Sequence, residues 1–133
     1  MTPAEKILKM IEEVDPEDSD TLDEIDARFW CWKHDLELLP NLDNHGFYFF
    51  MPESESTGWK ELIKYTRSRD ALKAERPEDW TYSSHQNRKG FEYPKPGWVV
   101  SLGSVCRSPI LPTEYLAELH AIVQAKEWKY DNA

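Results

Sequence analysis

Apolar residues at helical spacing predict two helices at the start of the chain. Thr2, Pro3 and Glu5 form a typical helix start, with a capping hydroxyl, a proline at the first helical position and a glutamate three residues after the cap. Thr21 and Glu24 repeat the capping pattern before a second periodic segment. The two apolar faces are formed by Ile7, Leu8, Ile11 and Val14, and by Leu22, Ile25, Phe29 and Trp32. The pattern therefore predicts two amphipathic helices joined by a proline-containing link.

The next third of the chain contains a strand pattern and a third helix. The aromatic run at 47–51 predicts a strand buried against helices. The segment before it, 36–46, contains Pro, Asn and Gly and is expected to be a connection, and 52–60 is expected to be an exposed loop. Ser68 precedes a short predicted helix that Pro77 ends.

The last third alternates between aromatic and polar residues before a final helix. Trp80 and Tyr82, and then Phe91 and Tyr93, alternate with polar neighbours on either side of a turn at 87–90, which predicts a hairpin. The apolar, β-branched run at 98–102 predicts a strand well inside a sheet. A helix is expected from Pro112 to about Lys129, with an apolar stripe formed by Leu116, Leu119 and Val123.

This order of elements predicts a mixed α/β (α+β) fold. A small, mainly antiparallel sheet of three to four strands is expected, with helices packed on both faces, as in an αβα sandwich. The 133 residues are the size of one ordinary domain. We therefore expect a single domain over residues 1–133, with residues 1–20 as an acidic N-terminal helical extension.

One group of motifs resembles a known family. Its residues are Thr66, Ser68, Asp70 and Ala71, followed by Pro77, Glu78 and Trp80. With the segments 22–30 and 98–104, they resemble small bacteriophage and prophage proteins of the ABA-sandwich type, over roughly residues 20–127. The chain differs from that pattern at Asp79, where Gly is usual, and in an aromatic insertion around 41–60. The resemblance implies a phage accessory protein in the bacterial host cytoplasm and assigns no catalytic residue.

Composition indicates a globular protein. Hydrophobic residues make up 40% of the chain and aromatic residues 13%, which is enough to bury a core. The longest apolar runs are far shorter than the roughly 20 residues of a membrane helix, so we expect a soluble cytoplasmic protein with no membrane partner. Cys31 and Cys106 are too few for a disulfide scaffold and are expected to be reduced.

The negative charge is concentrated in the first half of the chain. Residues 1–60 contain 15 acidic and 5 basic side chains, whereas residues 61–133 contain 10 and 11. Such a field repels nucleic acid and can attract a basic protein surface, although it also keeps a protein soluble. The candidate partner-binding residues are Glu12, Glu13, Asp15, Glu17, Asp18, Asp20, Asp23, Glu24 and Asp26. Because carboxylates on neighbouring helical turns lie roughly 5–6 Å apart, they could imitate a row of phosphates.

The predicted partner is accordingly a host protein with a basic surface, such as a nucleic-acid-binding defence factor. Direct binding of nucleic acid is not expected, because the net charge is −9. A solvated acidic face without a partner is the alternative. The oligomeric state stays open, and six tryptophans leave room for an aromatic interface such as that of a homodimer.

Metal and catalytic motifs are absent from the sequence. A calcium loop starting at Asp15 would place Asp20 where Gly is required and Asp26 where Glu is required. Cys31 and His34 lack the second Cys pair of a structural zinc site. The segment 101–109 contains neither a G-x-S-x-G elbow nor a C-x5-R loop. We therefore predict no metal, no cofactor and no enzymatic activity.

A second functional hypothesis is a ligand-binding module with an aromatic and basic pocket. Its candidate residues are Trp59, Tyr65, Trp80, Arg88 and Trp98. In such a pocket the aromatics would stack a nucleotide and the cation would hold its phosphate. The two hypotheses differ in salt sensitivity, because an interface of rim charges weakens as ionic strength rises.

Overall fold

The computed structural model describes residues 1–87 and 97–131, which belong to two compact units, residues 1–64 and 65–133. Within the described residues, each unit contains two helices and a three-stranded antiparallel sheet. The predicted mixed α/β class with antiparallel strands is confirmed. The strands are divided between two sheets rather than joined in one. The prediction of one domain over residues 1–133 stays a prediction.

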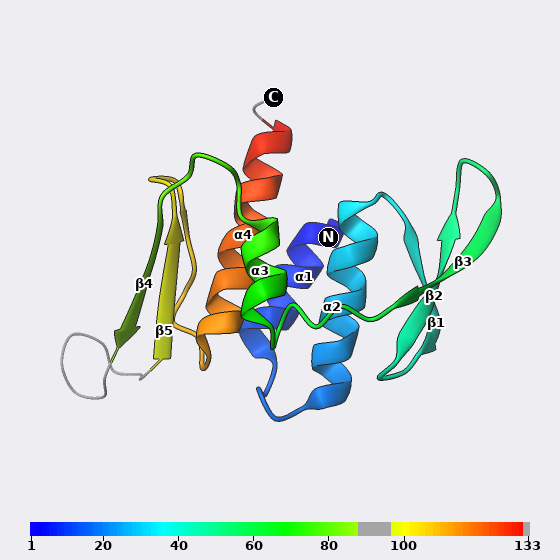
Figure 1. Cartoon of the computed structure of the whole chain (residues 1–133), viewed down its shortest axis with the longest axis horizontal. Coiled ribbons are helices and arrows are strands. Elements are labelled where there is room, and N and C mark those ends of the chain that lie inside the picture. Colours follow the sequence, from blue (N-terminus) through cyan, green and yellow to red (C-terminus); the bar gives the residue numbers. More distant parts are fainter. Residues whose placement is uncertain (88–96, 132–133) are drawn as a thin grey trace. The chain divides into compact units, whose positions relative to one another are not determined.

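The first unit contains α1 (Pro3–Glu13), α2 (Ser19–Lys33), β1 (Glu37–Leu42), β2 (Gly46–Met51) and β3 (Ser56–Glu61). The strand order is β1-β2-β3, so that β2 is central. Helix α1 packs against α2, and α2 packs against β1 and β2. Figure 1 shows α2 lying between α1 and the sheet.

Side-chain caps determine where the helices of the first unit begin. Thr2 Oγ1 accepts a hydrogen bond from the backbone N–H of Glu5 at 3.1 Å, as the sequence predicts for α1. Helix α2 begins two residues before the predicted cap at Thr21, because Asp18 accepts hydrogen bonds from the backbone N–H and the hydroxyl of Thr21. These bonds lower the pKa of the Asp18 carboxyl.

The core of the first unit joins α2 to the sheet. Ala27, Cys31, Phe47 and Leu62 are buried together, and Trp30 packs beside them. The Trp30 ring lies 5.6 Å from the ring of Phe47 and 5.2 Å from the ring of Phe49, measured between centroids. Aromatic pairs at this spacing contribute beyond their buried area. The face of β2 that carries Phe47 and Phe49 therefore faces α2.

The second unit contains α3 (Arg69–Glu75), β4 (Tyr82–Asn87), β5 (Gly97–Leu102), β6 (Cys106–Arg107) and α4 (Glu114–Asp131). The strand order is β4-β5-β6, and α4 packs against all three strands and against α3. The predicted stripe of α4 is buried, as are the core residues of β5; these residues are Leu116, Leu119, Val123, Val99, Val100 and Leu102. The predicted central strand at 98–102 and the predicted last helix are thereby confirmed.

Between α3 and β4, Asp79 adopts a left-handed backbone conformation. Its φ is 65°, a value that glycine adopts more easily than other residues. This is a physical reason why Gly would suit the position. The helix before it also agrees with the sequence, because Ser68 caps α3 by accepting a hydrogen bond from the N–H of Ala71 at 3.2 Å.

Two segments that the sequence analysis interpreted as irregular are strands. Residues 36–46, expected to be a connection, contain β1, and residues 52–60, expected to be a loop, contain most of β3. Pro40 is tolerated because β1 is an edge strand with an irregular register between Leu38 and Leu42. The polar residues of β3 form a strand because they pair with the aromatic strand β2.

The predicted hairpin is only partly visible in the structure. Tyr82 begins β4 as expected, but β4 pairs with β5, with Tyr82 opposite Leu102 and Asn87 opposite Gly97. The expected partner residues Phe91 and Tyr93 lie outside the described residues. No helix in the described part of the chain combines the length and the apolar character needed to cross a membrane.

Candidate functional site

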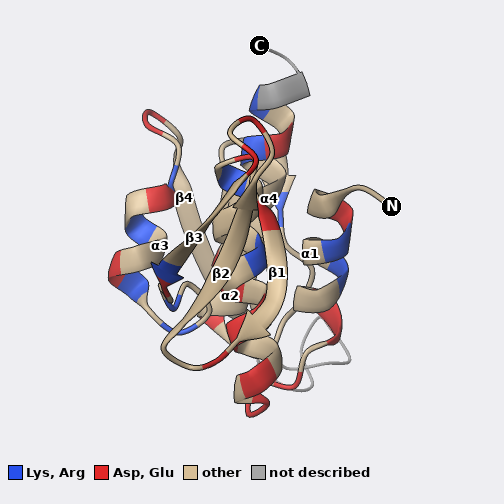
Figure 2. Cartoon of the chain, turned by 90° about the vertical axis from the view of Figure 1, so that its right-hand side faces the viewer, with Lys and Arg blue, Asp and Glu red and all other residues tan. Residues whose placement is uncertain are grey.

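The structure divides the nine predicted partner-binding carboxylates into two groups. Six of them are exposed and follow one another through the end of α1, the link and the start of α2: Glu12, Glu13, Asp15, Glu17, Asp18 and Asp20. We call this group the acidic turn. Figure 2 shows acidic residues in red along this part of the chain. The acidic turn is therefore a group of exposed carboxylates, close together in sequence, in the first unit.

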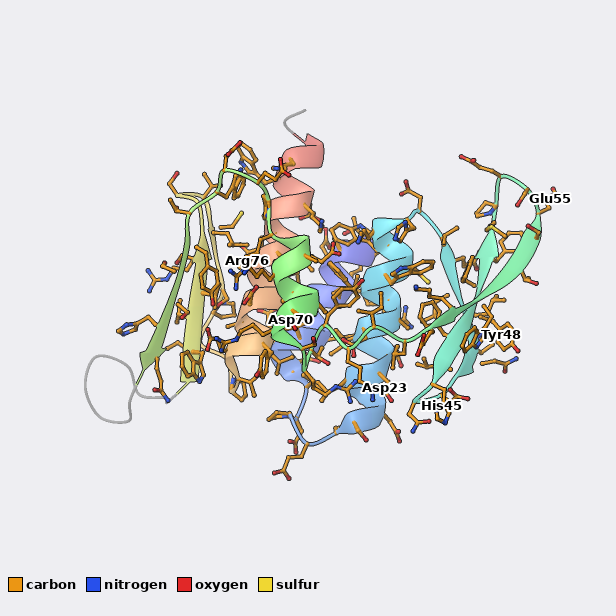
Figure 3. The ribbon with its side chains drawn as sticks, viewed as in Figure 1. Asp23, His45, Tyr48, Glu55, Asp70 and Arg76 are labelled. Carbon is orange, nitrogen blue, oxygen red and sulfur yellow. The ribbon has the colours of Figure 1, made fainter. Side chains whose placement is uncertain are left out.

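The other three predicted carboxylates do not extend that surface. Asp23 and Asp26 on α2 are only 4% and 1% exposed, so they cannot present charge to a partner. Figure 3 labels Asp23 on α2. Glu24 forms an ion pair with Arg28, one helical turn later, at 2.7 Å. Within the acidic turn, Asp18 also has the structural role of capping α2.

The structure describes four of the five residues of the predicted aromatic pocket, and the pocket stays a prediction. Trp59 lies on β3 in the first unit, whereas Tyr65, Trp80 and Trp98 belong to the second unit. Tyr65 is 2% exposed and offers no surface for stacking. Trp80 packs against Trp128, with ring centroids 5.6 Å apart. Arg88 lies outside the described residues.

The two cysteines of the chain, Cys31 and Cys106, are both buried. Burial raises the pKa of the Cys31 thiol to about 11, and burial also raises the pKa of Cys106. Both thiols are therefore protonated at neutral pH, the less nucleophilic state. No group of three or more His, Cys, Asp or Glu side chains is placed to hold a metal ion among the described residues.

A surface that the sequence analysis did not predict lies on the first sheet, opposite α2. Because side chains alternate along a strand, Tyr48 points away from the face that carries Phe47 and Phe49. Tyr48 lies directly opposite Trp59 on β3. Their exposed fractions are 47% and 53%, among the highest of the large hydrophobic residues of the chain. Figure 3 shows Tyr48 on the side of the sheet away from α2.

The outer face of this sheet is ordered by close packing. A Cβ atom added to Gly46 would lie 2.4 Å from a ring carbon of Trp59, so the indole covers the backbone of Gly46. Trp59 therefore lies along the sheet instead of extending into solvent. A half-exposed aromatic with a held orientation loses little conformational entropy when it binds a partner.

Carboxylates border these aromatics. Glu61 lies opposite Gly46 and Glu37 lies opposite Phe50, on the same side of the sheet as Tyr48. Glu53 and Glu55 are exposed in the turn between β2 and β3. The outer face thus combines the aromatic residues Tyr48, Phe50 and Trp59 with the acids Glu37 and Glu61. We call it the aromatic face.

The turn at the end of the aromatic face is closed by Asp43. Its carboxylate accepts hydrogen bonds from the backbone N–H groups of His45 at 2.8 Å and Gly46 at 3.0 Å. These bonds lower the pKa of Asp43 and place Gly46 at the start of β2. The signals that could have indicated the face were this Asx turn and the alternation of Phe47 with Tyr48.

Comparisons with protein-family models, curated proteins and solved structures find no match to this chain. The resemblance to phage ABA-sandwich proteins therefore stays a prediction from the sequence.

Proposed function

We propose that the protein is a non-enzymatic binding protein whose first unit docks on a basic protein surface. The observation that carries this proposal is the exposed pair of Tyr48 and Trp59, bordered by carboxylates. Tyr and Trp are enriched among residues that dominate binding energy, and a polar rim around them excludes water. A host protein that recognises nucleic acid through a basic groove is the partner class that fits this charge.

The charge distribution of the first unit supports a basic partner. Residues 1–64 contain 16 acidic and 6 basic side chains. The acidic turn adds a long-range negative field, which raises the rate of association with a basic surface. We assign the anchoring contacts to the aromatic face and the electrostatic steering to the acidic turn.

Binding of nucleic acid to the same face is disfavoured. Exposed aromatics can stack bases, but proteins that bind single strands combine stacking with a positively charged groove. Here Glu37, Glu53, Glu55 and Glu61 border the aromatics. Phosphates would therefore be repelled where a basic side chain would be attracted.

The test begins with affinity capture at 50 and 500 mM salt and continues with the purified partner. The double variant Tyr48→Ser/Trp59→Ala should raise the Kd of the partner at least about tenfold, because it removes two candidate hot-spot residues. Glu13→Gln/Glu17→Gln/Asp20→Asn should reduce mainly the association rate and its dependence on salt. Binding kinetics by surface plasmon resonance separate the two effects.

Val105→Ala is the matched control, because Val105 is 53% exposed and lies in the second unit. The control should bind as the wild type does. Equal affinity of the wild type and the double variant would refute the proposal. So would a wild-type homodimer that the double variant converts to monomers, because the face would then be occupied by a second copy. Light scattering measures that outcome directly.

A further inference from the structure

A cavity of about 500 Å³ lies in the first unit, away from the residues of the proposed docking anchor. Its helical walls are one face of α1, through Lys6 and Ile7, and one face of α2. The α2 residues are Arg28, Cys31 and Trp32, at positions i, i+3 and i+4, which lie on one side of a helix. Asp35 follows two residues after the helix ends. The start of β1 completes the lining.

The cavity combines an apolar surface with separate charges. Ile7 and Cys31 are buried, and Leu36 and Leu38 also line the space. Its volume lies within the roughly 300–1,000 Å³ of small-molecule sites, and its lining mixes apolar side chains with the charged residues Lys6, Arg28, Asp35 and Glu37. The cavity is therefore suited to a ligand with apolar side chains.

Three charged side chains in the lining have no ion-pair partner among the described residues. They are Lys6 on α1, Asp35 just after α2 and Glu37 at the start of β1, and all three are exposed. Arg28 is also in the lining and is paired with Glu24 through its Nε atom. The lining thus presents two cations, Lys6 and Arg28, and two carboxylates, Asp35 and Glu37.

The backbone of Asp35 is held in a conformation that favours glycine. The helix ends in a Schellman motif, in which Leu36 N–H bonds to the carbonyl of Cys31 at 2.8 Å and Asp35 N–H bonds to the carbonyl of Trp32 at 3.2 Å. Asp35 is the left-handed residue of this motif, with φ 56°. Glycine is the usual residue there, so a carboxylate is retained at a conformational cost.

The distance between the charges limits the size of the ligand. Arg28 lies five residues before Lys33, the last residue of α2, which corresponds to about 7.5 Å along the helix, and Asp35 lies two residues further along the chain. Two to three extended residues of a peptide span roughly 7–10 Å. Both the separation of charges and the volume exceed what a single amino acid fills.

We propose that this cavity binds a short peptide of two or three residues with apolar side chains and charged termini. Lys6 and Arg28 bind its carboxylate, Asp35 binds its ammonium group, and the apolar lining holds its side chains. This site lies apart from Tyr48 and Trp59 and shares only Glu37 with the aromatic face, so it does not rest on the proposed docking of a basic protein.

The test uses leucyl-leucine and leucyl-leucyl-leucine with free termini, together with their N-acetylated and C-amidated forms. Binding is followed by ¹⁵N–¹H NMR titration, with the shift changes expected on residues of α1, the end of α2 and the start of β1. Asp35→Asn tolerates the left-handed backbone and removes the charge. It should weaken binding of the free peptides at least about fivefold and leave binding of the N-acetylated forms unchanged.

Arg28→Gln/Lys6→Gln should show the reciprocal result: it should weaken binding only of the peptides that have a free carboxylate. Glu13→Gln is the matched control, because Glu13 is an exposed acid of α1 outside the lining, and it should bind as the wild type does.

Asp35→Gly should raise the midpoint of urea unfolding and still lose affinity for peptides with a free amine. Absence of shift changes up to millimolar peptide would overturn the proposal. Equal binding of blocked and free peptides by the wild type, or equal binding of the free peptides by the wild type and Asp35→Asn, would also overturn it.

Discussion

At the scale of single residues, Arg76 connects the elements of the second unit. Its Nε and Nη2 atoms donate to the two carboxylate oxygens of Glu118 at 2.8 and 3.0 Å, and its guanidinium lies 3.7 Å from the ring centroid of Tyr82 (Figure 3). Tyr82 in turn donates to Glu114 at 2.8 Å. Burial and this bond raise the pKa of Tyr82 to about 12. The end of α3, strand β4 and helix α4 are therefore joined through one guanidinium.

Arg76→Lys should destabilise the protein by about 1–3 kcal/mol, because lysine keeps the charge but cannot donate two parallel hydrogen bonds or stack on Tyr82. Urea unfolding measures the change. Arg69→Lys is the control: Arg69 is paired with Glu114 at 3.3 Å, but its side chain is 64% exposed. That variant should change stability by less than about 0.5 kcal/mol. Similar losses in both variants would contradict the role of Arg76.

The raised pKa of Cys31 also has a measurable consequence. Between the ordinary value of 9.0 and about 11, the folded chain keeps the thiol proton that the unfolded chain releases. The free energy of unfolding should therefore be independent of this group below pH 9 and should fall as the pH rises toward 11. Cys31→Ala should remove this part of the pH dependence.

At pH 8 the folded Cys31 thiol should react with iodoacetamide roughly 100-fold more slowly than in urea, because the thiolate fraction falls with the raised pKa. The rate is measured in a Cys106→Ala background, so that one thiol reports. A folded-state rate equal to the rate in urea would show that the thiol is neither buried nor shifted.

At the scale of elements, strand β2 carries a different aromatic layer on each face. Phe49 covers Gly58 on the side of α2, and Trp59 covers Gly46 on the outer side. Each glycine leaves room for a ring from the neighbouring strand. The pairing of β2 with β3 is therefore fixed by one ring-over-glycine contact on each face of the sheet. Aromatic rings over glycines are a known way of specifying register.

Gly46→Ala should destabilise the protein by about 2–3 kcal/mol, because the new Cβ would lie 2.5 Å from the backbone oxygen of Lys60, which cannot move alone. Gly58→Ala should cost less, about 1 kcal/mol, because its nearest neighbour is the far end of the Phe49 ring, at 2.6 Å. Thermal unfolding ranks the two variants. If Gly58→Ala were the more destabilising variant, the close contact of Gly46 with Trp59 and Lys60 would not be the tighter of the two.

In the same sheet, the local sequence was not sufficient to predict strands β1 and β3. Pro40 and Gly58 each disfavour a strand when considered alone, yet β1 and β3 form because both pair with β2. The caps at Thr2 and Ser68 were readable from sequence, because each involves residues only three positions apart.

At the scale of the whole molecule, charge is unevenly distributed. Residues 1–64 contain 16 acidic and 6 basic side chains, and residues 65–133 contain 9 and 10. Like charges on the exposed acidic turn repel one another when the protein is folded, and salt screens that repulsion. The acids near the start of α2 also interact favourably with its helix dipole, which partly offsets the repulsion.

Raising NaCl from about 10 to 300 mM should therefore stabilise the wild type by roughly 0.5–1 kcal/mol. The variant Glu13→Gln/Glu17→Gln/Asp20→Asn should show a smaller salt effect. Glu78→Gln, which removes an exposed acid from the second half of the chain, should respond as the wild type does. Equal salt effects in all three proteins would mean that the acidic turn carries no measurable repulsion.

Local sequence determined the four helices, the strand at 98–102, the antiparallel α+β class and the concentration of acids in the first half. These features depend on contacts between residues three or four positions apart, or on composition alone. Only the tertiary structure decided which carboxylates are exposed, because Asp23 and Asp26 are buried while Glu13 and Glu17 are not. It also decided that Tyr48 and Trp59 meet across two strands and that Lys6, Arg28 and Asp35 line one cavity. Such sites depend on pairing and packing between segments distant in sequence, which local periodicity does not encode.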